Sequence, residues 1–393
     1  MQLTVEKLVY GGHGLSRLDG RVVLTPLVLP GEEITAEPVD KLHARAIHID
    51  KPAPLRVAAP CPYFGICGGC HYQHAPYEYQ LAQKVDILRE VLRRVGRFEA
   101  PADINVISAD PWGYRNRIQL HVEDGQIGYL RMGSHSLCPV DKCPISSPRI
   151  NEAIGVLNEL VMERRWPEFI SIIELFTNET EVQLNVLETG KPLARHFFDW
   201  CAEHLPGYAS GAIDCLAASE RFRVGPRSFF QVNRFLVDAL VDAALSRATE
   251  GQQALDLYAG VGLFSLPLAR RFGQVTAVEG SASGVADLRF NSERAGVSIE
   301  AIKAETSEYL TGLDTTPDFV LADPPRDGLG KNAVRELIRL RPKRLTILAC
   351  DPATLARDLQ GLLESGYQIE AMTLVDLFPQ TYHLETIVHC FAT

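Results

Sequence analysis

The sequence predicts an α/β protein built around a doubly wound, mostly parallel sheet, with a small β-barrel before it and an α+β region between the two. From about residue 216 onward, short apolar strands alternate with helical stretches, which is typical of a parallel sheet covered by helices on both faces. In the first 55 residues, apolar and polar positions alternate in short runs separated by Gly and Asp, which indicates an antiparallel barrel. We therefore expect a barrel at 1–55, a central α+β domain at 56–215 and the doubly wound domain at 216–393.

The composition is that of a globular protein with room for two or three domains. Of its 393 residues, 46% are hydrophobic and 22% are charged. The net charge of -10 excludes a uniformly basic, nucleic-acid-coating surface but is compatible with a local positive groove. The N-terminus "MQLTVEKLVYGG" lacks a basic segment followed by an apolar one, and the apolar runs of the chain are short. We expect a monomeric cytoplasmic protein that does not enter a membrane.

The central region begins with an amphipathic helix. Apolar positions recur at helical spacing in "YEYQLAQKVDILREVLRRVGRF", and Gly96 marks the end of the pattern. Further on, short strands mix with two helical stretches, and Asp124-Gly125 is a hairpin signal. These patterns predict an α+β domain.

A glycine turn in the last region indicates a cofactor site. "DLYAGVGLFSLPLA" places Gly260 and Gly262 between a strand ending near Tyr258 and a helix, where open α/β sheets bind ligands. The next strand ends in Glu279, whose carboxylate can accept hydrogen bonds from ribose hydroxyls. Since the third glycine of the dinucleotide fingerprint is missing, S-adenosylmethionine is a better candidate than NAD.

A third strand leads into "VLADPPRDGL", which places Asp323 at its tip before two prolines that hold an extended turn. Methyltransferases acting on exocyclic amines carry a related Asn/Asp-Pro-Pro-aromatic tetrad. Arg326 stands where that aromatic residue would be, so the sequence does not favour methylation of an exocyclic amine.

The following strand ends in Cys350, before a helix that Asp351 or Thr354 can cap. A buried cysteine is most often a small apolar residue, but the N-terminal end of a helix favours a thiolate. Adding a thiolate to carbon 6 of a pyrimidine makes carbon 5 able to attack a methyl group, and a base must then remove the carbon 5 proton. Glu385, at the start of the last strand, is the candidate base, and His383 is its rival.

Five motifs in this order, "SFFQVN", "DLYAGVG", "ADPPRDGL", "CDPATLARD" and "LFPQTYHLET", resemble the RNA uracil-C5-methyltransferase family. The resemblance extends to "GGHGLSRLDGRVVLTPLVLPGE", which is similar to that family's RNA-binding TRAM barrel. It implies a Rossmann-like methyltransferase sheet, with Cys350 as nucleophile and Glu385 as proton acceptor. The residues expected to contact S-adenosylmethionine are Gln231, Tyr258, Gly260, Glu279, Glu305 and Asp323.

Nine cysteines, an odd number, fit a reducing compartment and a metal or cluster site better than a disulfide framework. Cys61, Cys67 and Cys70 are close enough in sequence for one metal centre, and their segment resembles the family's iron-sulfur segment. The resemblance adds Cys143 as fourth ligand, for which Cys138 is a rival. Four thiolates suit a [4Fe-4S] cluster, and zinc is the alternative. Three cysteines are expected in the core: Cys201, Cys215 and Cys390.

The leading hypothesis is methylation of carbon 5 of a uridine in structured RNA, with 23S rRNA favoured over transfer RNA. The target base must leave its stack, and Phe229, Phe230 and Arg326 are candidate neighbours for it. For the two phenylalanines, packing in the core is at least as strongly expected. Two other hypotheses are an RNA cytosine-C5 methyltransferase and a non-catalytic iron-sulfur RNA-binding module. The first usually carries a Pro-Cys beside the cofactor, which is absent from the Asp-Pro-Pro-Arg motif here; the second does not need the cofactor crevice.

Overall fold

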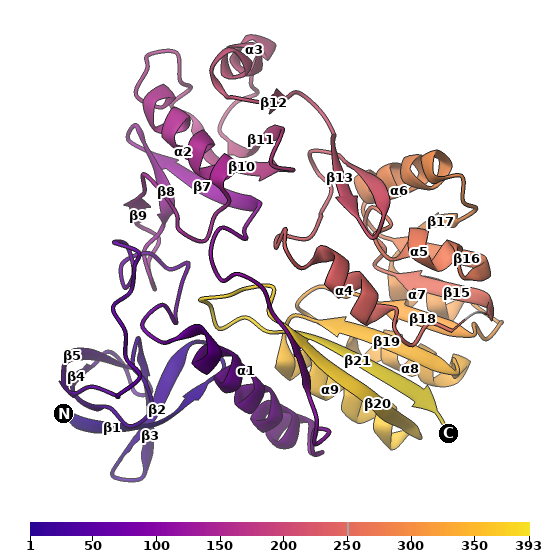
Figure 1. The fold of residues 1–393 in the computed structure, drawn as a ribbon, viewed down its shortest axis with the longest axis horizontal. Coiled ribbons are helices and arrows are strands. Elements are labelled where there is room, and N and C mark those ends of the chain that lie inside the picture. Colours follow the sequence, from indigo (N-terminus) through magenta and orange to yellow (C-terminus); the bar gives the residue numbers. More distant parts are fainter. Residues whose placement is uncertain (250) are drawn as a thin grey trace.

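The N-terminal strands form an antiparallel sheet in the computed structural model, which describes residues 1–249 and 251–393. The strand order is β3-β2-β1-β4-β5. The Leu24 amide donates to the carbonyl of Leu42 at 2.8 Å, which brings β3 to the chain just before β5 and curls the sheet. The strands are β1 (Gln2–Val9), β2 (His13–Leu18), β3 (Arg21–Pro26), β4 (Glu33–Pro38) and β5 (Ala44–Lys51). The predicted barrel topology is therefore present as a curled sheet, at the lower left of Figure 1.

A second sheet, of order β12-β11-β10-β7-β8-β9, lies in the central part of the chain. Asp124 and Gly125 both have positive φ and join β7 to β8, as the hairpin signal predicted. Two helices accompany this sheet, and α2 packs on β10, β11 and β8. The elements are β7 (Arg117–Glu123), β8 (Gln126–Leu130), β9 (Leu137–Pro139), α2 (Pro148–Leu160), β10 (Ile170–Thr177), β11 (Val182–Thr189), α3 (Arg195–His204) and β12 (Tyr208–Ala209).

The largest sheet has the order β17-β16-β15-β18-β19-β21-β20-β6. Its first five strands run parallel, whereas β21 is antiparallel to both of its neighbours. This arrangement confirms the predicted doubly wound α/β class. The strands are β6 (Asn105–Ile107), β15 (Gly251–Leu257), β16 (Phe272–Glu279), β17 (Glu300–Lys303), β18 (Phe319–Ala322), β19 (Arg344–Ala349), β20 (Tyr367–Val375) and β21 (Glu385–Ala392).

Helices cover both faces of this sheet because successive strand residues point to opposite sides. On β18, Val320 packs with the core of α1, α8 and α9, while Leu321 packs with that of α4 and α5. A two-stranded hairpin, β13 (Ile213–Ala217) and β14 (Glu220–Val224), lies against α6. The helices are α4 (Val237–Ala244), α5 (Ser265–Ala269), α6 (Ala282–Ala295), α7 (Thr306–Thr311), α8 (Gly330–Leu340) and α9 (Pro352–Glu364).

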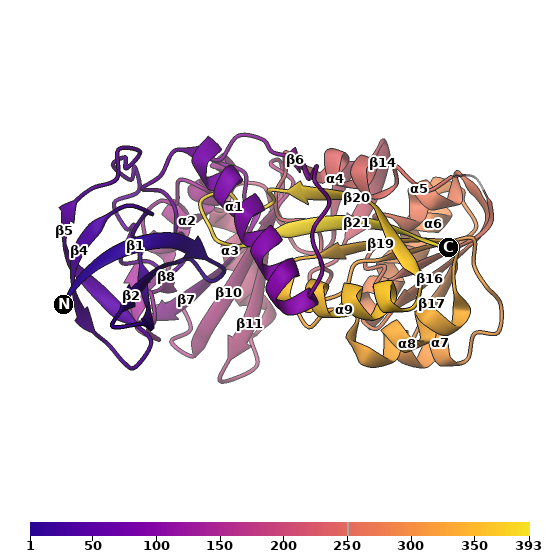
Figure 2. The ribbon, with the colours of Figure 1, turned by 90° about the horizontal axis from the view of Figure 1, so that it is seen from below.

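Two elements from the central region belong structurally with the C-terminal sheet: β6 adds a strand to it, and α1 packs on one of its faces. β6 pairs with β20, and α1 (Tyr77–Val91) packs its buried Ile87 and Leu88 into the core beneath α9. Figure 2 shows α1 between the N-terminal strands and the C-terminal sheet. The helix continues as a short π-helix, η1 (Leu92–Gly96), and a Cβ on Gly96 would lie 3.1 Å from the Ala356 carbonyl oxygen on α9. The division of the chain at 55 and 215 stays a prediction, since this sheet draws on residues from both sides of the second boundary.

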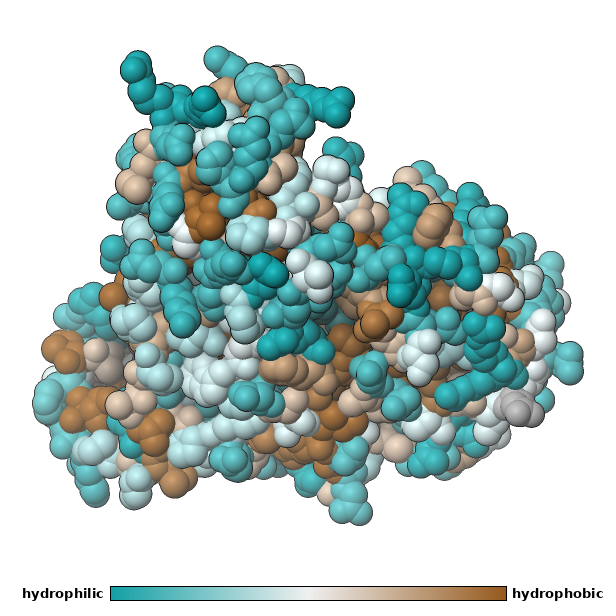
Figure 3. Space-filling model, turned by 45° about the horizontal axis from the view of Figure 1, so that its top comes forward, coloured by the Kyte–Doolittle hydropathy of each residue, from teal (hydrophilic) through white to brown (hydrophobic). Residues whose placement is uncertain are grey.

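The surface is mostly hydrophilic on the face seen in Figure 3, where apolar side chains gather only in small groups. In the part of the chain that the structure describes, every helix is too short or too polar to cross a membrane.

Candidate active site

The predicted site residues meet at one edge of the C-terminal sheet. Parallel strands end at the same edge, so the residues that follow them become neighbours. From β17 to β19 these residues are Glu305 after β17, Glu279 at the end of β16, Tyr258 and Gly260 after β15, Asp323 after β18 and Cys350 after β19. Glu385 joins them because the antiparallel β21 begins beside the end of β19, where Ala349 pairs with Thr386. The fold thus brings residues from six separate stretches of the sequence to one edge of the sheet, and we call the space in front of this edge the crevice.

Backbone amides fix the carboxylate of Glu279. The amide of Gly260 donates to Oε2 at 2.9 Å, and the amide of Ser281 donates to Oε1 at 2.6 Å. Gly260 has φ 55° and open space where a Cβ would be, so a ligand can approach its backbone. Gly284, which sequence reasoning missed, is needed because a Cβ there would lie 3.0 Å from Cγ of Glu279.

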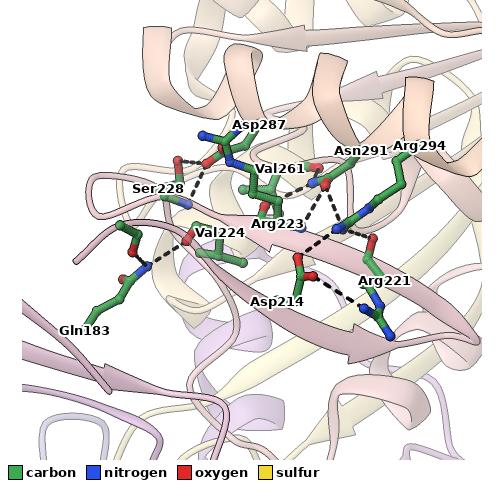
Figure 4. Close-up of polar contacts among 12 residues, drawn as sticks. Gln183, Asp214, Arg221, Arg223, Val224, Ser228, Val261, Asp287, Asn291 and Arg294 are labelled. Atoms are coloured by element: carbon green, nitrogen blue, oxygen red, sulfur yellow. Dashed lines mark hydrogen bonds and ion pairs between the residues drawn. The ribbon is translucent and has the colours of Figure 1, made fainter. Parts of the chain in front are cut away.

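Gln231 lies in residues 225–233, the segment that follows β14 and precedes α4. Asp287 of α6 holds this segment: its Oδ2 accepts the Gly225 amide at 2.7 Å and the Ser228 hydroxyl at 2.6 Å (Figure 4). Gln231 itself is 8% exposed, and its side-chain amide makes no hydrogen bond with any residue that the structure describes. Its polar atoms therefore remain available to a ligand.

Asn291, one turn further along α6, ties the hairpin to the glycine turn. Its side chain accepts the Arg223 amide at 2.7 Å and donates to the carbonyls of Arg223 and Val261 at 3.1 and 3.0 Å (Figure 4). Neither Asp287 nor Asn291 stands in a recognisable motif, so the sequence carried no signal for this network.

Two acidic side chains near this edge of the sheet have raised pKa values. Burial raises the pKa of Asp323 to about 7. Burial also raises the pKa of Asp256 to about 7, and the charges of Asp323 and Glu279 add to this effect, although Ser265 donates a hydrogen bond to Asp256. A cationic ligand would favour the ionised form of both groups. The crevice is therefore suited to a ligand that carries a positive charge.

The environment of Cys350 differs from the expectation. We predicted that the N-terminus of α9 favours the thiolate, but burial raises the pKa of the Cys350 thiol to about 11. The charges of Glu385 and Asp323 add to the rise, and Arg326 opposes it. The helix contributes little because Asp351, its N-cap, already accepts the free amides at 2.9 and 3.0 Å. The thiolate prediction is wrong for the protein without ligands.

Glu385 and His383 differ in how their polar atoms are engaged. The Arg326 guanidinium donates to Nδ1 of His383 at 2.8 Å, and burial together with this positive charge lowers the pKa of His383 to about 3. Burial, with the charge of Asp323 adding to it, raises the pKa of Glu385 well above its usual range. Among the described residues, none donates a hydrogen bond to the Glu385 carboxyl. Of the two candidate bases, Glu385 has the free oxygens and the stronger basicity.

A cavity of about 1390 Å³ lies between the cysteine-rich segment, the central sheet and residues 226–232. In the described part of the chain its wall includes neither Cys350 nor Glu385. Phe229 lines it and is 59% exposed, whereas Phe230 is 4% exposed and packs against Phe176 and Phe222. Phe230 is thus a core residue, which is the alternative that the sequence left open for it.

The four cysteines predicted to bind a cluster line this same cavity: Cys61, Cys67, Cys70 and Cys143. Burial is the main cause that raises the pKa of Cys67 to about 11 and that of Cys70 to about 12. The charge of Cys143 raises the pKa of all three partners, and that of Cys138 also raises the pKa of Cys61 and Cys67.

Cys143 is also held in place by its backbone. Its amide donates to Oδ1 of Asn151 at 2.7 Å, and Nδ2 of Asn151 donates back to its carbonyl at 3.0 Å. Across residues 1–249 and 251–393, however, no three His, Cys, Asp or Glu side chains are grouped closely enough to hold a metal ion. The three cysteines assigned to the core are buried, as predicted: Cys201, Cys215 and Cys390.

Comparisons with known proteins agree with this architecture. Residues 214–391 match the family described as tRNA (Uracil-5-)-methyltransferase. The chain is 31% identical to the 23S rRNA (uracil(1939)-C(5))-methyltransferase RlmD of Halomonas elongata, over 98% of this chain and 88% of that protein. It is 30% identical to the RlmD of Pseudomonas fluorescens, over 98% and 93%.

A solved structure extends the likeness to the whole fold. The tRNA (uracil-54, C5)-methyltransferase of Pyrococcus abyssi, in complex with S-adenosyl-L-homocysteine, has a TM-score of 0.79 and 27% identity, covering 99% of this chain and all of that one. The chain therefore belongs to the RNA uracil-C5-methyltransferase family and is an enzyme that uses S-adenosylmethionine.

Proposed function

We propose that this enzyme methylates carbon 5 of one uridine in structured RNA, with Cys350 as the nucleophile and Glu385 as the base. The observation that carries the proposal is that the partly buried thiol of Cys350 and the buried carboxyl of Glu385, which accepts no hydrogen bond from the described residues, lie at the ends of neighbouring strands, next to Asp323. We favour 23S rRNA as the substrate because the Halomonas and Pseudomonas relatives are named for it. Transfer RNA is the alternative, supported by the likeness to the Pyrococcus enzyme.

The reaction needs two proton transfers, one from Cys350 and one to Glu385. The sulfur of Cys350 adds to carbon 6 of the uracil as the thiol proton passes to solvent, so that carbon 5 becomes nucleophilic. S-adenosylmethionine, when bound, supplies the electrophilic methyl group. Glu385 then takes the proton from carbon 5, and the sulfur of Cys350 leaves as the double bond reforms. The raised pKa of Glu385 suits this role because it strengthens the carboxylate as a base.

We assign the cofactor to the edge formed by Gln231, Tyr258, Gly260, Glu279, Glu305 and Asp323. Each oxygen of Glu279 accepts one backbone amide and keeps another lone pair for a ribose hydroxyl. Gln231 and Asp323 have no side-chain hydrogen bonds to described residues, which fits ligand-binding groups. Glu305 is exposed at the outer end of the row, where its carboxyl lies near Gly280.

The cysteine site is proposed to hold a [4Fe-4S] cluster through Cys61, Cys67, Cys70 and Cys143, with zinc as the alternative. The shared cavity and the mutual charge effects support a common site. Cys143 is preferred over Cys138, because Cys138 is 3% exposed and packs in the core of the central sheet. We propose that the cluster has a structural role and that the N-terminal TRAM-like sheet binds RNA. We also propose that the protein is a monomer and is cytoplasmic.

RNA carrying 5-fluorouridine tests the mechanism. Fluorine at carbon 5 cannot be removed as a proton, so the enzyme should stay covalently attached through Cys350 in the presence of S-adenosylmethionine. Cys350→Ala should bind this RNA without forming the adduct, and methylation by that variant would contradict the assigned nucleophile. A trap with 5-fluorocytidine alone would favour the cytosine enzyme, and no methylation of any RNA would favour a non-catalytic module.

Mass spectrometry of 5-methyluridine in rRNA and transfer RNA, from cells with and without the gene, identifies the target RNA.

A further inference from the structure

The loop that leads into Glu385 is held from outside by buried polar groups. This loop, residues 376–384, joins β20 to β21 and carries His383. Nζ of Lys84 on α1 donates to Oδ1 of Asp376 at 2.6 Å and to the carbonyl of Phe378 at 3.0 Å, and the side chains of Lys84 and Asp376 are fully buried. The Tyr77 hydroxyl donates to Oδ2 of Asp376 at 2.8 Å.

Gln80, one turn before Lys84 on α1, is hydrogen-bonded to the middle of the loop. Its Nε2 donates to Oε1 of Gln380 at 3.0 Å, and its Oε1 accepts the amide of Gln380 at 3.2 Å. Gln380 has φ 68°, a left-handed backbone conformation that residues other than glycine rarely adopt unless surrounding contacts stabilise it. Gln80 and Gln380 are 1% and 2% exposed, so this pair is sealed from water.

The cysteine-rich segment holds the same residue from the other side. The amides of His71 and Tyr72 both donate to the carbonyl of Gln380, at 2.8 and 3.0 Å. Nε2 of Gln80 also donates to the carbonyl of Tyr72 at 3.0 Å. His71 directly follows Cys70 in the chain. The backbone next to this cysteine is therefore hydrogen-bonded to the loop before Glu385.

We propose that Gln80, acting through Gln380, is a positioning residue for the proton-removal step that the proposed function assigns to Glu385. Five residues after Gln380, the chain must place a carboxyl oxygen against carbon 5 of the methylated base. Misplacement of a reacting group by about 1 Å can slow a step by about 100-fold. The inference rests on the proposed function, and it predicts a defect in one step of that function only.

That step has its own readout. Proton removal comes after the covalent bond to Cys350 has formed and after methyl transfer, and only then can the sulfur leave. A misplaced base therefore leaves protein and RNA joined, whereas poor RNA or cofactor binding lowers the amount of joined product. The fraction of protein attached to ordinary uridine RNA, on a denaturing gel, separates the two cases.

The experiment compares Gln80→Met and Gln380→Met, alone and together, with unmodified RNA and S-adenosylmethionine. We expect each variant to hold at least about tenfold more covalent adduct than wild type, with a KM for S-adenosylmethionine within about twofold. The double variant should hold no more adduct than the stronger single variant, because the side-chain bond that Gln380→Met removes is already lost in Gln80→Met. Gln183→Met is the matched control: it removes buried amide bonds to the carbonyls of Gly211 and Val224, at 2.9 and 2.7 Å, and should leave the adduct at the wild-type level.

Each contrary result has a definite meaning. If adduct stays at the wild-type level in both Gln80→Met and Gln380→Met, or if it rises equally in Gln183→Met, Gln80 is not a positioning residue. Glu385→Gln serves as the reference, since loss of the base itself should trap the adduct. If Glu385→Gln traps adduct and Gln80→Met does not, only this inference fails; if Glu385→Gln and the 5-fluorouridine RNA both form none, the proposed function fails.

Discussion

Burial raises the pKa of Glu385, and the nearby carboxyl group of Asp323 raises it further. Two carboxyls that share a desolvated site resist being ionised together, so they take up protons more readily than carboxyls in water. The same pair also raises the pKa of the Cys350 thiol, against the pull of Arg326. The crevice is therefore poised to change its protonation when a cationic ligand or a substrate enters.

The coupling predicts the pH dependence of proton removal. Glu385 must be ionised to act, and its pKa lies well above the usual value of 4.5, so breakdown of the methylated adduct should be slow in acid and accelerate as pH rises through that pKa. Asp323→Asn removes one negative charge, so in this variant the rise of the breakdown rate with pH should occur at lower pH than in wild type. Rapid quenching of preformed adduct at a series of pH values measures this rate profile for both proteins. An unshifted profile in Asp323→Asn would show that the two carboxyls do not interact.

Asp256 should make the ligand-free protein less stable as pH rises. Its pKa is about 7 in the folded protein against 3.8 for the free group, so folding favours its protonated form. The folded state therefore loses free energy of unfolding, relative to its acid value, as pH rises from about 4 through about 7. Asp256→Asn should avoid this loss and exceed wild type by roughly 1–3 kcal/mol at about pH 8. Urea unfolding at several pH values checks this; equal pH profiles for the two proteins would contradict it.

Asp287 should control cofactor affinity without touching the cofactor. It fixes residues 225–233, which carry Gln231, by accepting two buried hydrogen bonds. Asp287→Ala should weaken S-adenosylmethionine binding by about tenfold in titration calorimetry, since such bonds are each worth about 1.5–3 kcal/mol. Asp214→Ala is the control: its side chain pairs with Arg294 at 2.8 Å in the same network but is 40% exposed, so affinity should change by less than about twofold. Equal effects of the two variants would exclude the positioning role.

The cysteines should separate into ligands and core residues by metal content. Cys67→Ser and Cys143→Ser should lose most of the bound metal under anaerobic purification, while Cys138→Ser should keep it. Cys67→Ser should also lower thermal stability or RNA affinity more than S-adenosylmethionine affinity. Elemental analysis distinguishes iron from zinc. Loss of metal in Cys138→Ser with retention in Cys143→Ser would reverse the assignment of the fourth ligand.

The doubly wound sheet could be predicted because its signals are local. Alternation of apolar strands and helices is written along the chain, and turn signals such as Asp124-Gly125 reappear with positive φ. The contribution of β6 to the C-terminal sheet could not be predicted in this way. Three residues, Asn105–Ile107, carry too little pattern to reveal that they pair with Thr373 to Val375. Such pairing depends on where α1 packs, which is a long-range property of the fold.

The sequence by itself determined which side chains reach the edge of the sheet, because a motif that follows a parallel strand must end there: Glu279, Asp323 and Cys350 all do. Only the tertiary structure decided their chemistry. The raised pKa of Cys350, the engagement of His383 by Arg326 and the grip of Gln80 on Gln380, 300 residues away in the chain, arise from burial and charge between distant segments. Desolvation and Coulomb interactions depend on distance in space, which a linear pattern does not encode.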